Sequence, residues 1–158
     1  MAKMLIIYHS RGGATQRMAE LVGEGASGAG ATVTIKKVQD TKPEDLLEYD
    51  AIVMGSPTYY GQMAAELKRL IDDSVKFHGR LAGKVGGAFS SSANIGGGNE
   101  TTIRGILDTL LIHGMIVQGM AAGDHYGPVS IGKPDERASN QCRIYGKRVA
   151  ELAGRLCG

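Results

Sequence analysis

The sequence predicts an α/β protein in which a parallel sheet is covered by helices on both faces. Short continuous apolar runs, of which Met4–Ile7 is the first, are typical of strands buried on both faces. Each run is followed by a segment whose apolar residues recur at helical spacing. Because this alternation occurs five times, the chain is expected to form a three-layer sandwich around a five-stranded parallel sheet.

The first half of the chain supplies two strands and two helices. The strand at residues 4–7 precedes a helix at 14–28, where glycines end the helical pattern. Residues 32–35 alternate polar and apolar side chains and then meet two lysines, which is typical of an edge strand with one wet face. The sequence TKPE at the start of residues 41–47 resembles a capping box and predicts a short helix.

The second half continues the same alternation. Further strands are expected at residues 51–54, 85–89 and 115–117, and further helices at 63–71, 99–113 and 145–156. Asn99 is the expected N-cap of its helix. With the second strand at an edge, the natural strand order is 2-1-3-4-5, and the crevice for a ligand lies between the first and third strands.

Length and composition exclude several classes of protein. The 158 residues fit a single domain, 1–158, with an ordinary 42% of hydrophobic residues. The net charge is +2 and no basic run exceeds Lys36-Lys37, so nucleic acid is not an expected partner. The two cysteines lack CxxC spacing, and no segment resembles a signal peptide or a membrane span. The sequence therefore predicts a cytoplasmic protein that does not bind membranes.

The loop after the first strand has the composition of a phosphate site. In parallel sheets, ligands bind beyond the carboxyl ends of the strands, and SRGGAT at residues 10–15 joins the first strand to the first helix. The unpaired N–H groups at a helix start attract anions. No lysine stands where a nucleoside triphosphate would need one, so the loop suits a phosphate that is held and not transferred.

Two later loops complete the expected site. GSPTYYGQM at residues 55–63 offers two tyrosines in a turn, and SSSANIGGGNE at 90–100 offers hydroxyls and bare backbone. A phosphate cradle, an aromatic platform and a backbone-lined slot at one edge of the sheet suit a flat, polar, phosphorylated ring system. Flavin mononucleotide (FMN) has this chemistry.

Other phosphate-linked functions lack their reacting groups. GEGASG at residues 23–28 fits a dinucleotide fingerprint but lies at the end of the first helix instead of at its start. A response regulator would need acidic residues where His9 and Ser10 stand, and a cysteine phosphatase would need a thiol in the first loop. The four histidines show no paired metal spacing, so no metal is expected.

Three segments carry a resemblance to a known family. GSPTYYGQM, FSSSANIGGGNE and HGM (His113–Met115) resemble, in order and spacing, segments of the flavodoxin-like family and most closely its branch of WrbA-type NAD(P)H:quinone oxidoreductases. The resemblance extends from the first strand to about Gly127, and Tyr126-Gly127 is similar to a later turn of the family.

The resemblance implies a set of cofactor-binding residues. Residues 10–15 would bind the FMN phosphate, residues 57–61 and 91–98 would hold the ring and the ribityl chain, and His113 matches a family position near the flavin. The implied residues are Ser10, Arg11, Gly12, Gly13, Ala14, Thr15, Pro57, Thr58, Tyr59, Tyr60, Gly61, Ser91, Ser92, Ala93, Asn94, Gly96, Gly97, Gly98 and His113.

These assignments leave alternatives open. His113 equally suits a helix-end histidine that caps carbonyl groups, and either tyrosine of the pair 59–60 suits core packing. No acid or base is obligatory, because the flavin performs the chemistry; Tyr60 and His113 are candidates for a supporting role.

The chain departs from the family at several points. Gly12 stands where the family commonly has an aromatic residue that contacts the nicotinamide nucleotide, and the family's tryptophan near the quinone has no counterpart. The link from Val38 to Asp50 and the region after Gly114 are shorter than in the family. Those longer segments help to build the family's tetramer, so the sequence leaves open whether this chain forms a dimer or a tetramer.

The resemblance implies an FMN-dependent oxidoreductase that passes two electrons from NADH or NADPH to a quinone. A flavodoxin-type electron carrier, which docks on a redox protein and has no turnover of its own, is the alternative. Typical flavodoxins are strongly acidic and this chain carries +2, which favours the enzyme. An interaction module without FMN is a third interpretation.

Overall fold

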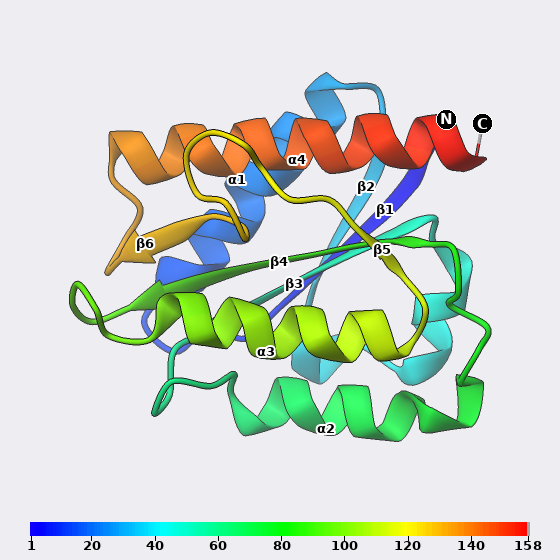
Figure 1. The fold of residues 1–158 in the computed structure, drawn as a ribbon, viewed down its shortest axis with the longest axis horizontal. Helices are drawn as coiled ribbons and strands as arrows, with labels where there is room; N and C mark the ends of the chain where they lie inside the picture. Colours follow the sequence, from blue (N-terminus) through cyan, green and yellow to red (C-terminus); the bar gives the residue numbers. More distant parts are fainter. Residues whose placement is uncertain (158) are drawn as a thin grey trace.

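A parallel sheet forms the middle layer of the molecule (Figure 1). The computed structural model describes residues 1–157. The strands β1 (Lys3–Tyr8), β2 (Thr32–Lys37), β3 (Ala51–Pro57), β4 (Val85–Ser92) and β5 (Ile116–Val117) lie in the order β2-β1-β3-β4-β5, with every pair parallel. The predicted fold class and strand order are thereby confirmed.

The edge of the sheet beside β4 differs from the sequence prediction. One fifth strand was expected, but β5 pairs only with the amino end of β4, while an additional strand, β6 (Val129–Ile131), pairs with its carboxyl end. The chain leaves the sheet after Val117 and returns where the N–H of Ser90 donates to the carbonyl of Pro128 at 3.1 Å. β6 was missed because its three residues, VSI, form no continuous apolar run.

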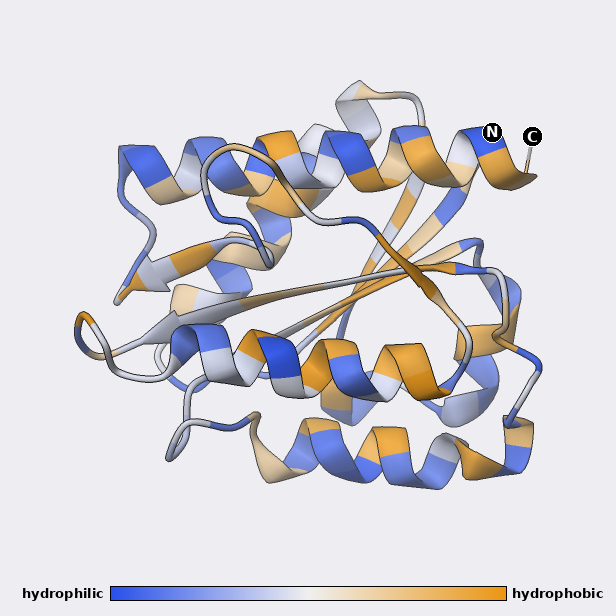
Figure 2. Ribbon diagram, in the orientation of Figure 1, coloured by the Kyte–Doolittle hydropathy of each residue, from blue (hydrophilic) through white to orange (hydrophobic). Residues whose placement is uncertain are grey.

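Helices cover both faces of the sheet (Figure 1). The helices α1 (Ala14–Gly28) and α4 (Glu136–Cys157) pack on one face, and α2 (Ala65–Asp73) and α3 (Asn99–Ile112) pack on the other. Three short 3₁₀ segments, η1 (Val38–Asp40), η2 (Pro43–Glu48) and η3 (Ser74–Phe77), lie in the connections. Figure 2 shows the alternation of apolar and hydrophilic residues along the helices that this packing requires.

Strand β1 illustrates why the core has two halves. Met4, Ile6 and Tyr8 pack against α1 and α4, whereas Leu5 and Ile7 pack against α2 and α3. Successive side chains of a strand point to opposite faces, so a run without polar residues is needed when both faces are covered. The sheet is therefore fixed from both sides and holds the loops at its carboxyl edge in place.

Two expected helix caps are wrong. The N-cap of α3 is Gly98 and not Asn99, whose Nδ2 instead donates to Ser92 Oγ at 3.1 Å. In η2 the capping carboxylate belongs to Asp45, which accepts the N–H of Lys42 at 3.0 Å, while the Thr41 hydroxyl donates to the carbonyl of Lys37. In both places the side chain that sequence rules assigned to the cap instead donates a hydrogen bond to the last residue of a strand, Ser92 of β4 or Lys37 of β2.

One further expectation fails at the end of the chain. The last helix was expected from its apolar spacing over residues 145–156, but Leu156, at the end of that pattern, has a half-exposed side chain. Among residues 1–157, no helix combines the length and the apolar composition that a bilayer crossing requires.

Candidate functional site

Three loops meet at the carboxyl edge of the sheet, by which we mean the side formed by the carboxyl ends of its strands. This side is on the left of Figure 1. The N–H of His9 donates to the carbonyl of Gly55 at 3.1 Å, which joins the ends of β1 and β3. The N–H of Thr58 donates to the carbonyl of Ser91 at 2.8 Å, which joins the ends of β3 and β4. The hydroxyls of Thr15 and Ser91 lie 3.0 Å apart, so the start of α1 is also tied to the third loop.

The first loop presents an open helix start. Gly13 is the N-cap of α1 with φ of 95°, and its N–H donates to Ser10 Oγ at 3.1 Å. The first backbone hydrogen bond of the helix runs from the N–H of Arg17 to the carbonyl of Gly13. The N–H groups of residues 14–16 therefore have no partner within the helix. The first turn of α1 carries no acidic residue, so its positive end is not neutralised from within.

The second loop is a tight hairpin turn. Tyr59 and Gln62 exchange two backbone hydrogen bonds of 2.9 and 3.1 Å, and both intervening residues, Tyr60 and Gly61, adopt positive φ. Tyr60 is fully exposed, so the core-packing alternative is wrong for this residue. Tyr59 is half-buried and meets the His9 ring edge-on, with 6.2 Å between the ring centroids.

The third loop packs against the second through glycines. A Cβ at Gly98 would lie 2.9 Å from Cα of Gly61, so the two loops approach at a distance that only glycine permits. Thr101 Oγ1 donates to the carbonyl of Gly61 at 2.8 Å and holds the contact. The half-buried and exposed residues of this loop, Ala93, Asn94, Gly96 and Gly97, form its rim.

The structure does not bring His113 to this edge. α3 begins at the carboxyl edge and runs back along the sheet for 14 residues, or about 21 Å, so its C-cap, His113, lies at the opposite edge (Figure 1). There His113 Nε2 lies 2.8 Å from Ser74 Oγ, whose hydroxyl donates to the carbonyl of Ile71. Within one chain, His113 is a helix-end residue and not part of the loop cluster.

The surroundings of His113 change its acidity. Burial lowers the pKa of its imidazole, and the nearby His78 lowers this pKa further by repulsion. The three loops at the carboxyl ends of the strands and the His113–Ser74 pair at the opposite ends are thus two separate polar regions of the molecule.

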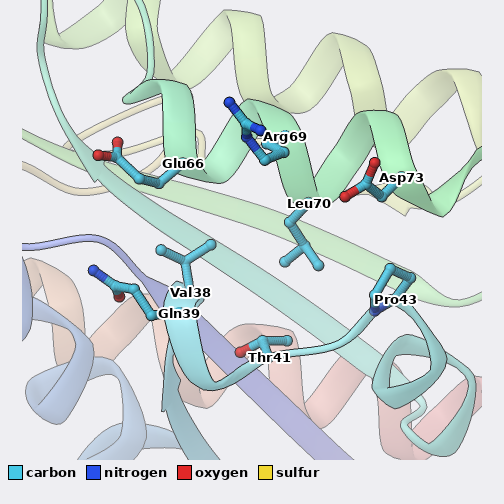
Figure 3. A pocket seen from close by; sticks show the side chains of 8 residues that line it. All are labelled: Val38, Gln39, Thr41, Pro43, Glu66, Arg69, Leu70 and Asp73. Carbon is cyan, nitrogen blue, oxygen red and sulfur yellow. The ribbon is translucent and has the colours of Figure 1, made fainter.

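A cavity of about 250 Å³ lies beside the loop cluster, between α2 and the segment that follows β2 (Figure 3). Val38 and Leu70 point toward one another across its centre, and charged side chains of α2 line one wall. The lining residues are Val38, Gln39, Thr41, Pro43, Glu66, Arg69, Leu70 and Asp73. None of them belongs to the three loops, although Glu66 lies 3.9 Å from His9.

Sequence reasoning missed His9. Its side chain is only 12% exposed, and its Nδ1 is buried without a hydrogen-bond partner among residues 1–157. The signal was its position directly after a buried strand, within the first post-strand loop. The sequence analysis considered His9 only for paired metal spacing and as a residue standing where a response regulator would need an acid.

The comparisons with known proteins agree with this geometry. Residues 5–95 match the family described as the flavodoxin domain. The chain belongs to the flavodoxin family. A protein of Archaeoglobus fulgidus named NAD(P)H dehydrogenase (quinone) is 37% identical, and the alignment covers 99% of this chain and 100% of the relative. A flavodoxin of Aquifex aeolicus is 42% identical over 96% of this chain and 86% of the relative.

A solved structure confirms the resemblance to the WrbA branch. The flavodoxin-family, WrbA-like protein of Agrobacterium tumefaciens superposes with a TM-score of 0.81 at 31% identity, and the superposition covers 99% of each chain. This flavodoxin-family chain is shorter than some relatives. The alignment with the A. fulgidus protein spans 191 positions, 33 more than the 158 residues here, whereas the alignment with the A. aeolicus flavodoxin spans 160.

Proposed function

We propose that this chain binds FMN and passes two electrons from NADH or NADPH, through the flavin, to a quinone. The observation that carries the proposal is the junction of the three loops at one edge of the sheet. There the first turn of α1 carries no acidic residue, and the hydroxyls of Thr15 and Ser91 join this turn to the third loop. The third loop in turn contacts the second loop where Gly98 meets Gly61.

The residues present fit FMN. A Cβ at Gly12 or Gly13 would meet no atom within 4 Å, so open space lies beside the backbone of the first loop. The N–H groups of residues 14–16, the Ser10 hydroxyl and the exposed Arg11 would hold the phosphate there. The ring would lie between the second and third loops, where Thr58, Tyr59 and the backbone of residues 91–98 would orient it.

The protein's part in the reaction is positional. Bound FMN would supply the hydride and electron transfer, which needs no acid or base from the protein. The hydrogen bond from Thr58 to Ser91 and the closed turn at residues 59–62 hold the loops rigid, so the ring edge would keep a fixed exposure to donor and acceptor. The exposed Tyr60 would cover that edge and reduce access of water to it.

The names of several relatives support the choice of donor and acceptor. The A. fulgidus relative and a Sinorhizobium fredii relative, which is 36% identical over 99% of each chain, are both named NAD(P)H dehydrogenase (quinone). The net charge of +2 also distinguishes this chain from strongly acidic electron carriers.

An electron carrier is the second candidate, and sequence identity favours it. The relative named flavodoxin is 42% identical to this chain, against 37% for the A. fulgidus relative named NAD(P)H dehydrogenase (quinone), and its alignment is shorter, 160 positions against 191. A carrier would use the same FMN site but would dock on a redox protein in place of a nicotinamide nucleotide and a quinone.

The two candidates differ in turnover. The purified chain, reconstituted with FMN, is mixed with NADH or NADPH and a soluble quinone, and nucleotide oxidation is followed at 340 nm; the same mixture without the protein is the control. Quinone-dependent oxidation that saturates with both substrates supports the enzyme. Retained FMN without turnover, together with widely separated potentials for the first and second electrons, supports the carrier, and failure to retain FMN refutes both.

A further inference from the structure

His9 lies beneath the first loop, where three elements meet. It follows β1 directly, and its N–H bonds to the carbonyl of Gly55 at the end of β3. Its ring lies against Tyr59 from the second loop, and its Nε2 lies 3.9 Å from Glu66 Oε2 on the first turn of α2. The side chain is 12% exposed and is therefore mostly buried where these elements meet.

One ring nitrogen of His9 is left without a partner. When Nε2 carries the ring proton toward the Glu66 carboxylate, Nδ1 is an acceptor. This Nδ1 is buried and has no hydrogen bond among residues 1–157. Folded proteins rarely leave a buried polar atom unpaired, because the lost hydration is not replaced. Among residues 1–157, His113 Nδ1 and Arg148 Nε are also buried without a partner, but only His9 adjoins the first loop, so a donor from outside the chain is expected at its Nδ1.

The position of His9 indicates which donor this is. The next residue is Ser10, and residues 10–15 form the loop proposed to hold the FMN phosphate. In FMN the atoms adjoining the phosphate are those of the ribityl chain, whose hydroxyls donate hydrogen bonds. Ionised phosphate oxygens only accept, so they supply no hydrogen to an Nδ1 that also accepts.

We propose that Nδ1 of His9 accepts a hydrogen bond from a ribityl hydroxyl of FMN. This assignment rests on the proposed FMN site. It makes His9 a positioning residue, which sets where the ribityl chain lies relative to the phosphate loop and thereby where the ring lies between the second and third loops.

The test uses substitutions that keep or remove the acceptor at Nδ1. The amide of asparagine reaches the position of Nδ1, whereas the amide of glutamine reaches that of Nε2. We expect His9→Phe and His9→Gln to weaken FMN binding about tenfold, as the loss of one hydrogen bond implies, and His9→Asn to remain within about threefold of the wild type. The dissociation constants are measured on the apoprotein by quenching of flavin fluorescence.

Ligand truncation separates the ribityl chain from the phosphate. Riboflavin keeps the ribityl hydroxyls and lacks the phosphate, and lumiflavin lacks both. The loss caused by His9→Phe should be equal for FMN and riboflavin and absent for lumiflavin. A loss confined to FMN would place Nδ1 on the phosphate and overturn the assignment.

Controls distinguish this proposal from the one it rests on. His78→Phe changes an exposed histidine at the opposite edge of the sheet and should leave all three affinities unchanged. Failure of the wild type to bind FMN refutes the proposed function itself. Normal FMN binding by the wild type and by a folded His9→Phe variant alike refutes only the role of His9, since it means that Nδ1 is satisfied by water.

Discussion

Backbone conformation at single residues shapes the proposed flavin site. Gly13, Gly61 and Gly98 have φ of 95°, 75° and 99°, values that residues with a side chain rarely adopt. Tyr60, with φ of 51°, is the one described residue other than glycine with a positive φ. It is also fully exposed, so no packing compensates the strain. These residues let the three loops turn sharply and approach one another.

Gly13→Asp should abolish FMN retention while the apoprotein still folds. There is room for the side chain, but its carboxylate would face the phosphate, and two like charges about 4 Å apart repel by roughly 4 kcal/mol at intermediate dielectric. Titration of the apoprotein with FMN measures the loss. Gly13→Ala is the matched control, because it introduces the same backbone strain without the charge. Equal affinities for the two variants would mean that the phosphate lies elsewhere.

Tyr60→Asn should raise the free energy of unfolding of the apoprotein by about 0.5–1 kcal/mol. Asparagine tolerates the left-handed conformation, and Asn-Gly is the preferred pair in this two-residue turn. The urea midpoint is the measurement. Tyr60→Ala, which leaves the strain in place, should give no gain. A midpoint that is unchanged or lower in Tyr60→Asn would show that the tyrosine ring itself stabilises the loop.

At the scale of elements, α1 and α4 are in close contact at two glycines. This contact fixes the position of α1, the helix that begins at the first loop. A Cβ at Gly146 of α4 would lie 1.9 Å from the carbonyl oxygen of Val22 in α1, and a Cβ at Gly25 would lie 1.9 Å from that of Arg143. The two helices thus touch through their backbones. Since α1 begins at the first loop, this contact holds the helix start in register with the sheet.

Gly146→Ala should destabilise the protein by at least about 2 kcal/mol, although alanine is the better helix former, because the helices must separate. Gly154→Ala in the same helix is the matched control. Its Cβ would meet no atom within 4 Å, so propensity alone acts and a gain of up to about 1 kcal/mol is expected. Comparison of the two unfolding midpoints decides, and a stabilised Gly146→Ala would contradict the close contact.

The end of α3 should make stability depend on pH. Burial and His78 lower the pKa of folded His113 below its ordinary value of 6.5. Between the two values the unfolded chain binds a proton that the folded chain does not, so stability falls as the pH falls below about 6.5. His113→Gln keeps a donor for Ser74 Oγ and should flatten this part of the urea-midpoint profile. Identical slopes with and without His113 would assign the effect to other groups.

The whole molecule matters because the strand order brings distant loops together. The order β2-β1-β3-β4-β5 sets β1, β3 and β4 side by side, so the loops that follow them share one edge. The one segment with a dinucleotide-like glycine pattern, residues 23–28, lies at the other end of α1, away from this edge. Among residues 1–157, the proposed phosphate site at the first loop therefore has no second glycine pattern of the dinucleotide type beside it.

FMN should stabilise the protein more than FAD does. A ligand that binds only the folded state at one hundred times its dissociation constant adds about 2.7 kcal/mol to the free energy of unfolding. At equal concentrations, FAD should add less, because the proposed role of the first loop is to hold a terminal phosphate, which FAD lacks. Thermal unfolding with each flavin, followed by mass spectrometry of the retained cofactor, measures the difference. Preferential retention of FAD would contradict the proposal.

The sequence determined the fold and indicated where the proposed site lies. Apolar runs such as Met4–Ile7 and the helical stripes between them are local patterns, and together they imply a parallel sheet in the order that the structure confirms. Because ligands of such sheets bind beyond the carboxyl ends, the loops at residues 10–15, 55–63 and 90–100 could be named from the sequence alone as the expected ligand-binding region. The sharp turns of these loops depend on glycines, which can be read directly from the sequence.

Only the tertiary structure decided which residues face the site. His113 was placed near the flavin by resemblance, but the length of α3 carries it to the opposite edge. His9 was passed over because burial and an unpaired ring nitrogen arise only when β1, β3 and α2 are packed together. The division of the last strand into β5 and β6, and the cap at Gly98, likewise depend on hydrogen bonds to β4 and Ser92. A local pattern fixes where the chain turns, whereas contacts between segments distant in sequence fix what each side chain meets.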